Sequence, residues 1–80
     1  MNKQEIISKV QQCVARVFEL NVSEISLQSS TDNTPNWDSL GHLRLIMDLE
    51  AEFGISFSTE DIPTLVTVDI ICDTLEEYGA

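Results

Sequence analysis

The chain has 80 residues, a hydrophobic content of 42% and a formal net charge of −10 at pH 7. A chain this short supplies one small core, so we expect a single domain over residues 1–80 that works as a non-enzymatic binding or carrier module. The negative surface repels nucleic acids and anionic lipids, so we expect no nucleic acid partner, and it suits basic protein partners. The alternative, that the acidic surface serves only solubility, stays open.

The N-terminal segment predicts a helix over residues 3–19. Asn2 and, three residues later, Glu5 resemble a helix-capping pair. The apolar residues that recur at helical spacing are Ile6, Val10, Val14, Val17 and Phe18. No secretory signal precedes the helix, and no stretch is long and apolar enough to span a bilayer. We therefore expect a cytoplasmic protein without stable membrane insertion, and a monomer.

Residues 20–38 show no sustained period and are rich in Ser, Thr, Asn and Asp, whose side chains compete with helical backbone hydrogen bonds. We predict a long first loop here. A structureless segment of this length inside a compact domain is usually functional. The apolar residues expected to pin it to the core are Val22, Ile25, Leu27 and Trp37.

A second helix is predicted over residues 39–53, with Asp38 as its N-cap and Gly54 as its C-terminal stop. Its expected buried stripe comprises Leu40, Leu43, Ile46, Met47 and Phe53. The acidic residues expected on its other side are Asp48, Glu50 and Glu52.

A short helical turn is predicted over residues 58–62, before Pro63, and a further helix after the N-cap Thr67. The apolar face of this last helix comprises Val68, Ile71, Cys72 and Leu75. Four helical segments with a long first loop and a short third helix predict an all-α four-helix bundle. The residues expected to be largely buried in it are Val14, Phe18, Leu40, Leu43, Met47, Ile71 and Leu75.

The two cysteines, Cys13 and Cys72, lie far apart in the chain, each among apolar residues. We predict buried free thiols, which suit a reducing compartment. His42 is the only histidine, so the ligands for a zinc-type site are too few and we expect no bound metal.

The chemically informative segment is Asp38-Ser39-Leu40, at the predicted start of the second helix. The first N–H groups of a helix lack intrahelical partners and lie at the positive end of its dipole, so a phosphate ester on Ser39 would be stabilised there. The long polar loop would keep Ser39 accessible to a modifying enzyme. The alternative is that Ser39 is only a helix-start residue, which is a common role of serine.

The chain resembles the acyl carrier proteins over nearly its whole length. The matching segments are Asp38-Ser39-Leu40 with residues 43–55, residues 25–27, Thr31-Asp32, residues 58–63 and Thr67-Val68. The resemblance implies a four-helix bundle in which Ser39, flanked by Asp38 and Leu40, takes a 4′-phosphopantetheine arm from coenzyme A. The thiol of this arm would carry acyl groups as thioesters in fatty-acid, polyketide or other specialised acyl biosynthesis.

The resemblance also implies partners, namely a phosphopantetheinyl transferase and acyl-loading, elongating or transferring enzymes with basic docking patches. The residues expected to bind these partners are Arg44, Asp48, Glu50 and Glu52. The family usually has acids where this chain has Gly41 and Arg44, and Trp37 and His42 are also unusual. We interpret these departures as signs of a specialised carrier. In the alternative interpretation, Arg44 pairs with Asp48 at i+4 and discriminates nothing.

Other interpretations are weaker or stay open. Ser39, His42 and Asp38 all lie at one helix start, without a separate oxyanion hole or substrate pocket, which argues against a catalytic set. A calcium loop starting at Asp32 fails because its sixth and twelfth positions are Trp37 and Leu43 instead of Gly and Glu. A peptidyl or aminoacyl carrier, and a carrier-like interaction module that works unmodified, remain open.

Overall fold

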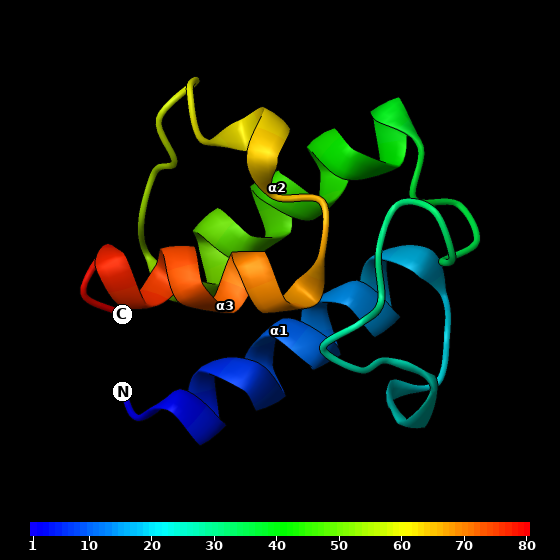
Figure 1. Ribbon diagram of the computed structural model, residues 1–80, viewed down its shortest axis with the longest axis horizontal. Coiled ribbons are helices and arrows are strands. Elements are labelled where there is room, and N and C mark those ends of the chain that lie inside the picture. Colours follow the sequence, from blue (N-terminus) through cyan, green and yellow to red (C-terminus); the bar gives the residue numbers. More distant parts are fainter.

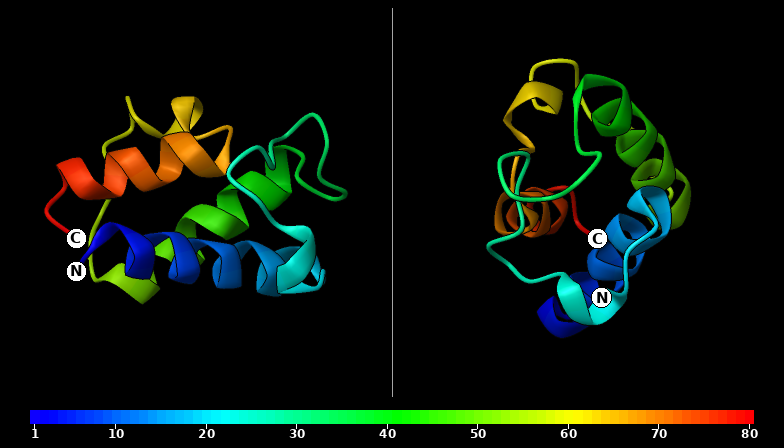
Figure 2. Two further views of the ribbon diagram at one scale, coloured as in Figure 1. Left: turned by 60° about the horizontal axis from the view of Figure 1, so that its bottom comes forward. Right: turned by 90° about the vertical axis from the view of Figure 1, so that its right-hand side faces the viewer.

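The structure, a computed structural model that describes residues 1–80, contains three α-helices and two 3₁₀ turns. The elements are α1 (Lys3–Phe18), a 3₁₀ turn (Val22–Glu24), α2 (Ser39–Phe53), a second 3₁₀ turn (Ile62–Thr64) and α3 (Val68–Glu77). α1 packs against both α2 and α3. Because α1 and α3 run in opposite directions, the two ends of the chain lie side by side (Figure 1, Figure 2).

The helices begin and end at the residues that local chemistry favours. The three N-caps are Asn2, Asp38 and Thr67, which accept hydrogen bonds from the amides of Glu5, Gly41 and Ile70 at 2.8, 2.8 and 3.1 Å. α2 ends at Gly54, whose φ of 65° lies in the left-handed region that glycine adopts without a Cβ penalty. The predicted caps and the predicted stop are confirmed.

The core is one cluster of 17 buried hydrophobic residues drawn from all three helices and the loops between them. Val14 and Phe18 of α1 and Ile71 and Leu75 of α3 belong to it, as predicted. Both cysteines are free and buried, which confirms that prediction as well. The broad apolar stripe of α1 therefore forms the centre of the packing.

The predicted buried side of α2 is wrong in part. Ile46 is buried and Phe53 is partly buried against the core, as predicted. Leu40, Leu43 and Met47 are 67%, 54% and 69% exposed. The buried residues of α2 are Gly41, Leu45, Ile46 and Leu49. Apolar residues occupy two sides of this helix, so helical spacing alone does not decide which side faces the core. The glycine decides it, because it lets its own side of α2 approach α1, and the two buried leucines follow it at i+4 spacing.

The long first loop is held to the bundle through both side chains and backbone. Ile25 and Trp37 are buried and Leu27 is partly buried, as predicted. Val22 is 49% exposed instead, because it begins a 3₁₀ turn in which no residue is buried. Backbone hydrogen bonds also join the loop to the segment around the start of α3. They run from Thr31 to Val66, from Val68 to Ser29 and from Asp69 to Leu27, at 3.1, 3.0 and 3.1 Å.

The predicted third helix, residues 58–62, is a single 3₁₀ turn, Ile62–Thr64, which begins at the last residue of the expected segment. Residues 58–61 form the turn before it, closed by the Asp61 amide on the Ser58 carbonyl at 3.1 Å. Pro63 lacks the N–H group that a longer helix would need here. The all-α class is confirmed, but the α-helices number three. None of them combines the length and the apolarity needed to cross a membrane.

Leu45→Ala should lower the free energy of unfolding by about 2–5 kcal/mol, because it empties a fully buried site on α2. Leu43→Ala, the matched control on the exposed side, should lower it by less than about 1 kcal/mol. Urea denaturation followed by circular dichroism measures both values. Equal losses would contradict the assigned orientation of α2.

Candidate functional site

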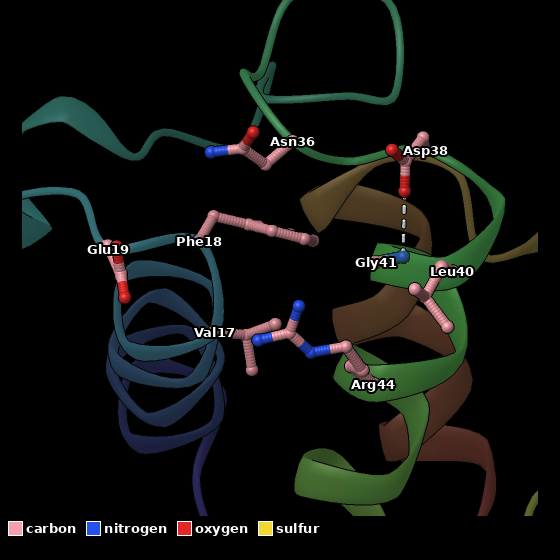
Figure 3. Close-up of a pocket in the computed structure, with 8 residues that line it drawn as sticks. All are labelled: Val17, Phe18, Glu19, Asn36, Asp38, Leu40, Gly41 and Arg44. Atoms are coloured by element: carbon pink, nitrogen blue, oxygen red, sulfur yellow. Dashed lines mark hydrogen bonds between the residues drawn. The ribbon is translucent and has the colours of Figure 1, made fainter.

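Ser39 is the first residue of α2, and it is exposed to solvent. The capping role at this helix end belongs to its neighbour, because the Asp38 carboxylate accepts the hydrogen bond from the Gly41 amide (Figure 3). The N–H groups of Ser39 and Leu40 have no backbone partner. Helix capping therefore does not explain Ser39, and free donors lie next to its hydroxyl.

Three aromatic rings stack on one another beside this helix start. Trp37 is 3% exposed and stacks on Phe18 and on His42, at ring-centroid distances of 5.5 and 6.3 Å. Its indole N–H donates to His42 Nδ1 at 3.0 Å. Since an indole nitrogen only donates, Nδ1 is unprotonated and the proton of the neutral imidazole lies on Nε2. Nε2 then donates to the Ile62 carbonyl oxygen at 2.8 Å, which links α2 to the second 3₁₀ turn.

A groove of about 550 Å³ opens beside Ser39, between the start of α2 and the second 3₁₀ turn. Trp37 and His42 form part of its lining. Apolar side chains such as Leu43 and polar ones such as Asp32 complete a mixed surface. A chain attached to Ser39 can lie along this groove without entering the bundle.

Gly41 is buried where α2 comes closest to the end of α1. A Cβ atom at this position would lie 2.2 Å from the Asn36 carbonyl oxygen and 2.8 Å from a ring carbon of Phe18. Figure 3 shows the Phe18 ring directed at this glycine. The sequence interpretation treated Gly41 as a missing acid, but the structure gives it a steric role, because no side chain fits there.

Sequence reasoning missed the positioning roles of Gly41, Trp37 and His42. One signal was available, because glycine in a helix is less favourable than alanine by about 1 kcal/mol and usually has a packing reason. The bond from His42 to the Ile62 carbonyl had no sequence signal, since it depends on how α2 meets a turn 20 residues away.

Arg44 lies on the exposed side of α2, and it is the one basic residue of the chain that forms no ion pair. The alternative in which it pairs with Asp48 is wrong, because Asp48 is bound by Arg16 at 2.8 Å. Glu52 is also engaged, with Arg16 at 3.4 Å and Lys9 at 3.5 Å. Two of the acids expected to face partners therefore also join α2 to α1.

Glu50 has an internal partner too, since its Oε2 accepts a hydrogen bond from the Phe57 amide at 2.9 Å. The exposed part of α2 next to Ser39 is apolar instead. We name the exposed side chains of Leu40, Leu43 and Met47 the α2 face. Arg44 lies four residues after the first of these and three before the last, so it lies within this face.

The residues considered as a catalytic set are not arranged to activate Ser39. Both ring nitrogens of His42 are engaged, one with the Trp37 indole and one with the Ile62 carbonyl. The Asp38 carboxylate caps α2. His42 is therefore not free to take a proton from the serine. No three His, Cys, Asp or Glu side chains gather in a way that could hold a metal ion.

Comparisons with known proteins agree with one another. Residues 8–77 match the family model described as a phosphopantetheine attachment site. The chain is 36% identical over 76 residues to the acyl carrier protein of an Exiguobacterium species, covering 95% of this chain and 96% of that protein. It is 36% identical over 80 residues to the acyl carrier protein of Thermosynechococcus vestitus, covering 100% and 99%. The fold is similar to a solved structure of the acyl carrier protein from Enterococcus faecalis, with a TM-score of 0.74 and 26% identity over 96% of this chain and 98% of that chain.

Gly41→Ala tests the close approach of α2 to α1. Helix propensity alone would favour alanine by about 1 kcal/mol. The added methyl group meets a carbonyl oxygen and a ring carbon, so we expect the free energy of unfolding to fall by about 1–3 kcal/mol in urea denaturation. Ala51→Gly, at an exposed position of the same helix, is the propensity control and should cost about 1 kcal/mol. A more stable Gly41→Ala protein would refute the steric role of the glycine.

Proposed function

The chain belongs to the family of acyl carrier proteins, and we propose that its 4′-phosphopantetheine arm is attached to Ser39. Acyl carrier proteins hold this group covalently and carry acyl groups on it, and the carrier function of this chain follows from its membership. One observation supports Ser39 as the attachment residue. Ser39 is exposed at the first position of α2, within the matched residues 8–77, and Asp38 takes over the capping.

The start of α2 suits a phosphodiester. The N–H groups of Ser39 and Leu40 lack backbone partners and lie at the positive end of the helix dipole, so they can donate to phosphate oxygens. The arm supplies a thiol that holds acyl groups as thioesters. The groove beside Ser39 offers the arm a surface, and Asp38 keeps the helix end closed beneath it.

Partner enzymes would dock on the α2 face. Its three large apolar side chains are exposed next to Ser39, and contiguous exposed apolar residues mark interaction sites. The partners are a phosphopantetheinyl transferase and enzymes that load, elongate or transfer acyl groups. The net charge of −10 attracts their basic patches at long range. The chain contributes carriage and docking, and catalysis belongs to these enzymes.

The second 3₁₀ turn would be the counterpart of the short third helix of the family, so that this turn and the three α-helices would correspond to its four helices. The free thiols of Cys13 and Cys72 support a reducing, cytoplasmic compartment.

Incubation with a phosphopantetheinyl transferase and coenzyme A should add one arm to the wild-type chain and none to Ser39→Ala. Intact mass measures the addition. Ser23→Ala, at an exposed serine of the first 3₁₀ turn, is the matched control and should be modified like the wild type. Modification of Ser39→Ala would place the arm elsewhere, and an unmodified wild type would point to an interaction module without an arm.

The number of fast-reacting thiols per chain is an independent measure of whether the arm has been attached. Burial raises the pKa of Cys13 to about 12 and that of Cys72 to about 11, from an ordinary value of 9.0. Both thiols therefore stay protonated near about pH 8 and react slowly with a thiol reagent while the chain is folded. The modified chain should show one fast-reacting thiol, and Ser39→Ala should show none. A second fast thiol in the folded modified chain would contradict the burial of the cysteines.

Arg44→Glu tests whether Arg44 weakens the binding of enzymes of general fatty-acid synthesis. Their basic patches would be repelled by the like charge of Arg44 within the α2 face. The modified variant should be loaded with a kcat/KM about 2- to 10-fold higher than the wild type at low salt, and the difference should shrink at high salt. Arg44→Gln, which removes the charge without reversing it, should fall between them. Equal rates for all three proteins would show that Arg44 discriminates nothing.

A further inference from the structure

Two stacked rings separate the groove beside Ser39 from the helix core. They are Trp37 and His42, whose ring planes are 18° apart. Leu43, which is 54% exposed, lies on the groove side. Phe18, which is 2% exposed and belongs to the core, stacks on Trp37 from outside the groove at a ring-centroid distance of 5.5 Å. An acyl chain that lies in this groove and turns toward the core meets these rings.

Two hydrogen bonds fasten the rings in place. Trp37 Nε1 donates to His42 Nδ1 at 3.0 Å, and His42 Nε2 donates to the Ile62 carbonyl oxygen at 2.8 Å. The second bond joins α2 to the second 3₁₀ turn, which are the two segments that an entering chain would have to push apart. Displacing His42 would leave the N–H of the buried Trp37 indole without its partner, and this is unfavourable.

We propose that the Trp37–His42 wall keeps the acyl chain out of the helix core, so that the cargo stays in the open groove whatever its length. This inference rests on the proposed attachment at Ser39. A long alkyl chain gains little in a groove open to solvent, whereas a short or polar acyl group needs no apolar interior. The mixed lining of the groove, with Asp32 and Thr31 beside apolar side chains, suits the same cargo. The carrier is therefore matched to acyl groups with few carbons or with polar substituents.

The first test compares arms of different length on the wild-type chain. A transferase and the matching acyl-coenzyme A would load acetyl, butyryl, octanoyl or palmitoyl arms, and intact mass would verify each form. Tm should stay within about 2 °C across the series, because no added methylene group enters the core. A Tm that rises steadily with chain length would overturn the proposal. If intact mass showed that the chain is never loaded, the proposed attachment at Ser39 would be wrong, and the inference that rests on it would be wrong as well.

Methyl NMR spectra of the same forms locate the cargo directly. The octanoyl arm should shift the methyl signals of Leu43 and Val66, which line the groove, relative to the acetyl form. The signals of Leu45 and Leu49, which are fully buried, should not move. Shifts at these two core residues would overturn the proposal even if Tm were constant.

The second test removes the fastening of the wall. The double variant Trp37→Phe, His42→Leu keeps apolar bulk and eliminates both hydrogen bonds. The Tm of its palmitoyl form should exceed that of its acetyl form by about 4 °C or more, because the chain can now enter the core. Phe57→Leu is the matched control, since it weakens a different aromatic pair, that of Phe57 with Tyr78. Its Tm should not depend on the length of the acyl chain. If the acetyl and palmitoyl forms of the double variant had the same Tm, the proposed role of the wall would be overturned. If that variant does not fold, the wild-type Tm and methyl measurements decide.

Discussion

The structure depends on the contact between Gly41 and the end of α1. Because this position carries no side chain, the first turn of α2 reaches Phe18 and the Asn36 carbonyl oxygen. Contact along this side of α2 directs Leu45 into the core and leaves Ser39 facing solvent. The absence of one side chain therefore determines both how α2 packs and how Ser39, the proposed attachment residue, is presented. A larger residue would move the packing and the exposed start of α2 together.

Charge is divided between packing and recognition. Arg16 of α1 binds Asp48 and Glu52 of α2, so part of the acidic surface of α2 is used within the molecule. Exposed pairs of this kind contribute at most about 1 kcal/mol each, but together they hold the acids in defined positions. The net charge of −10 still acts on basic partners at a distance. The surface of α2 itself is different, because exposed apolar side chains surround the unpaired Arg44 there.

Local signals were sufficient for the starts of the three α-helices and for the end of α2 at Gly54, since caps such as Asp38 and Thr67 act within one turn of the backbone. They could not determine which side of α2 is buried, because two sides are apolar and the choice depends on what Gly41 meets in other segments. The link from α2 to Ile62 was equally out of reach, because it joins residues 20 positions apart through side-chain geometry. Ser39 stood out for another reason, since helix-start chemistry and the family resemblance both pointed to it.

The two ends of the chain meet at one pole of the bundle, and α2 begins at the other (Figure 1). Lys3 of α1 ties this pole together by binding Asp73 and Glu76 of α3 at 2.6 and 3.0 Å. A tether added at either terminus would therefore leave from the same pole, away from Ser39. The molecule can be linked to a neighbour in either order, or anchored to a solid support, with the start of α2 left free.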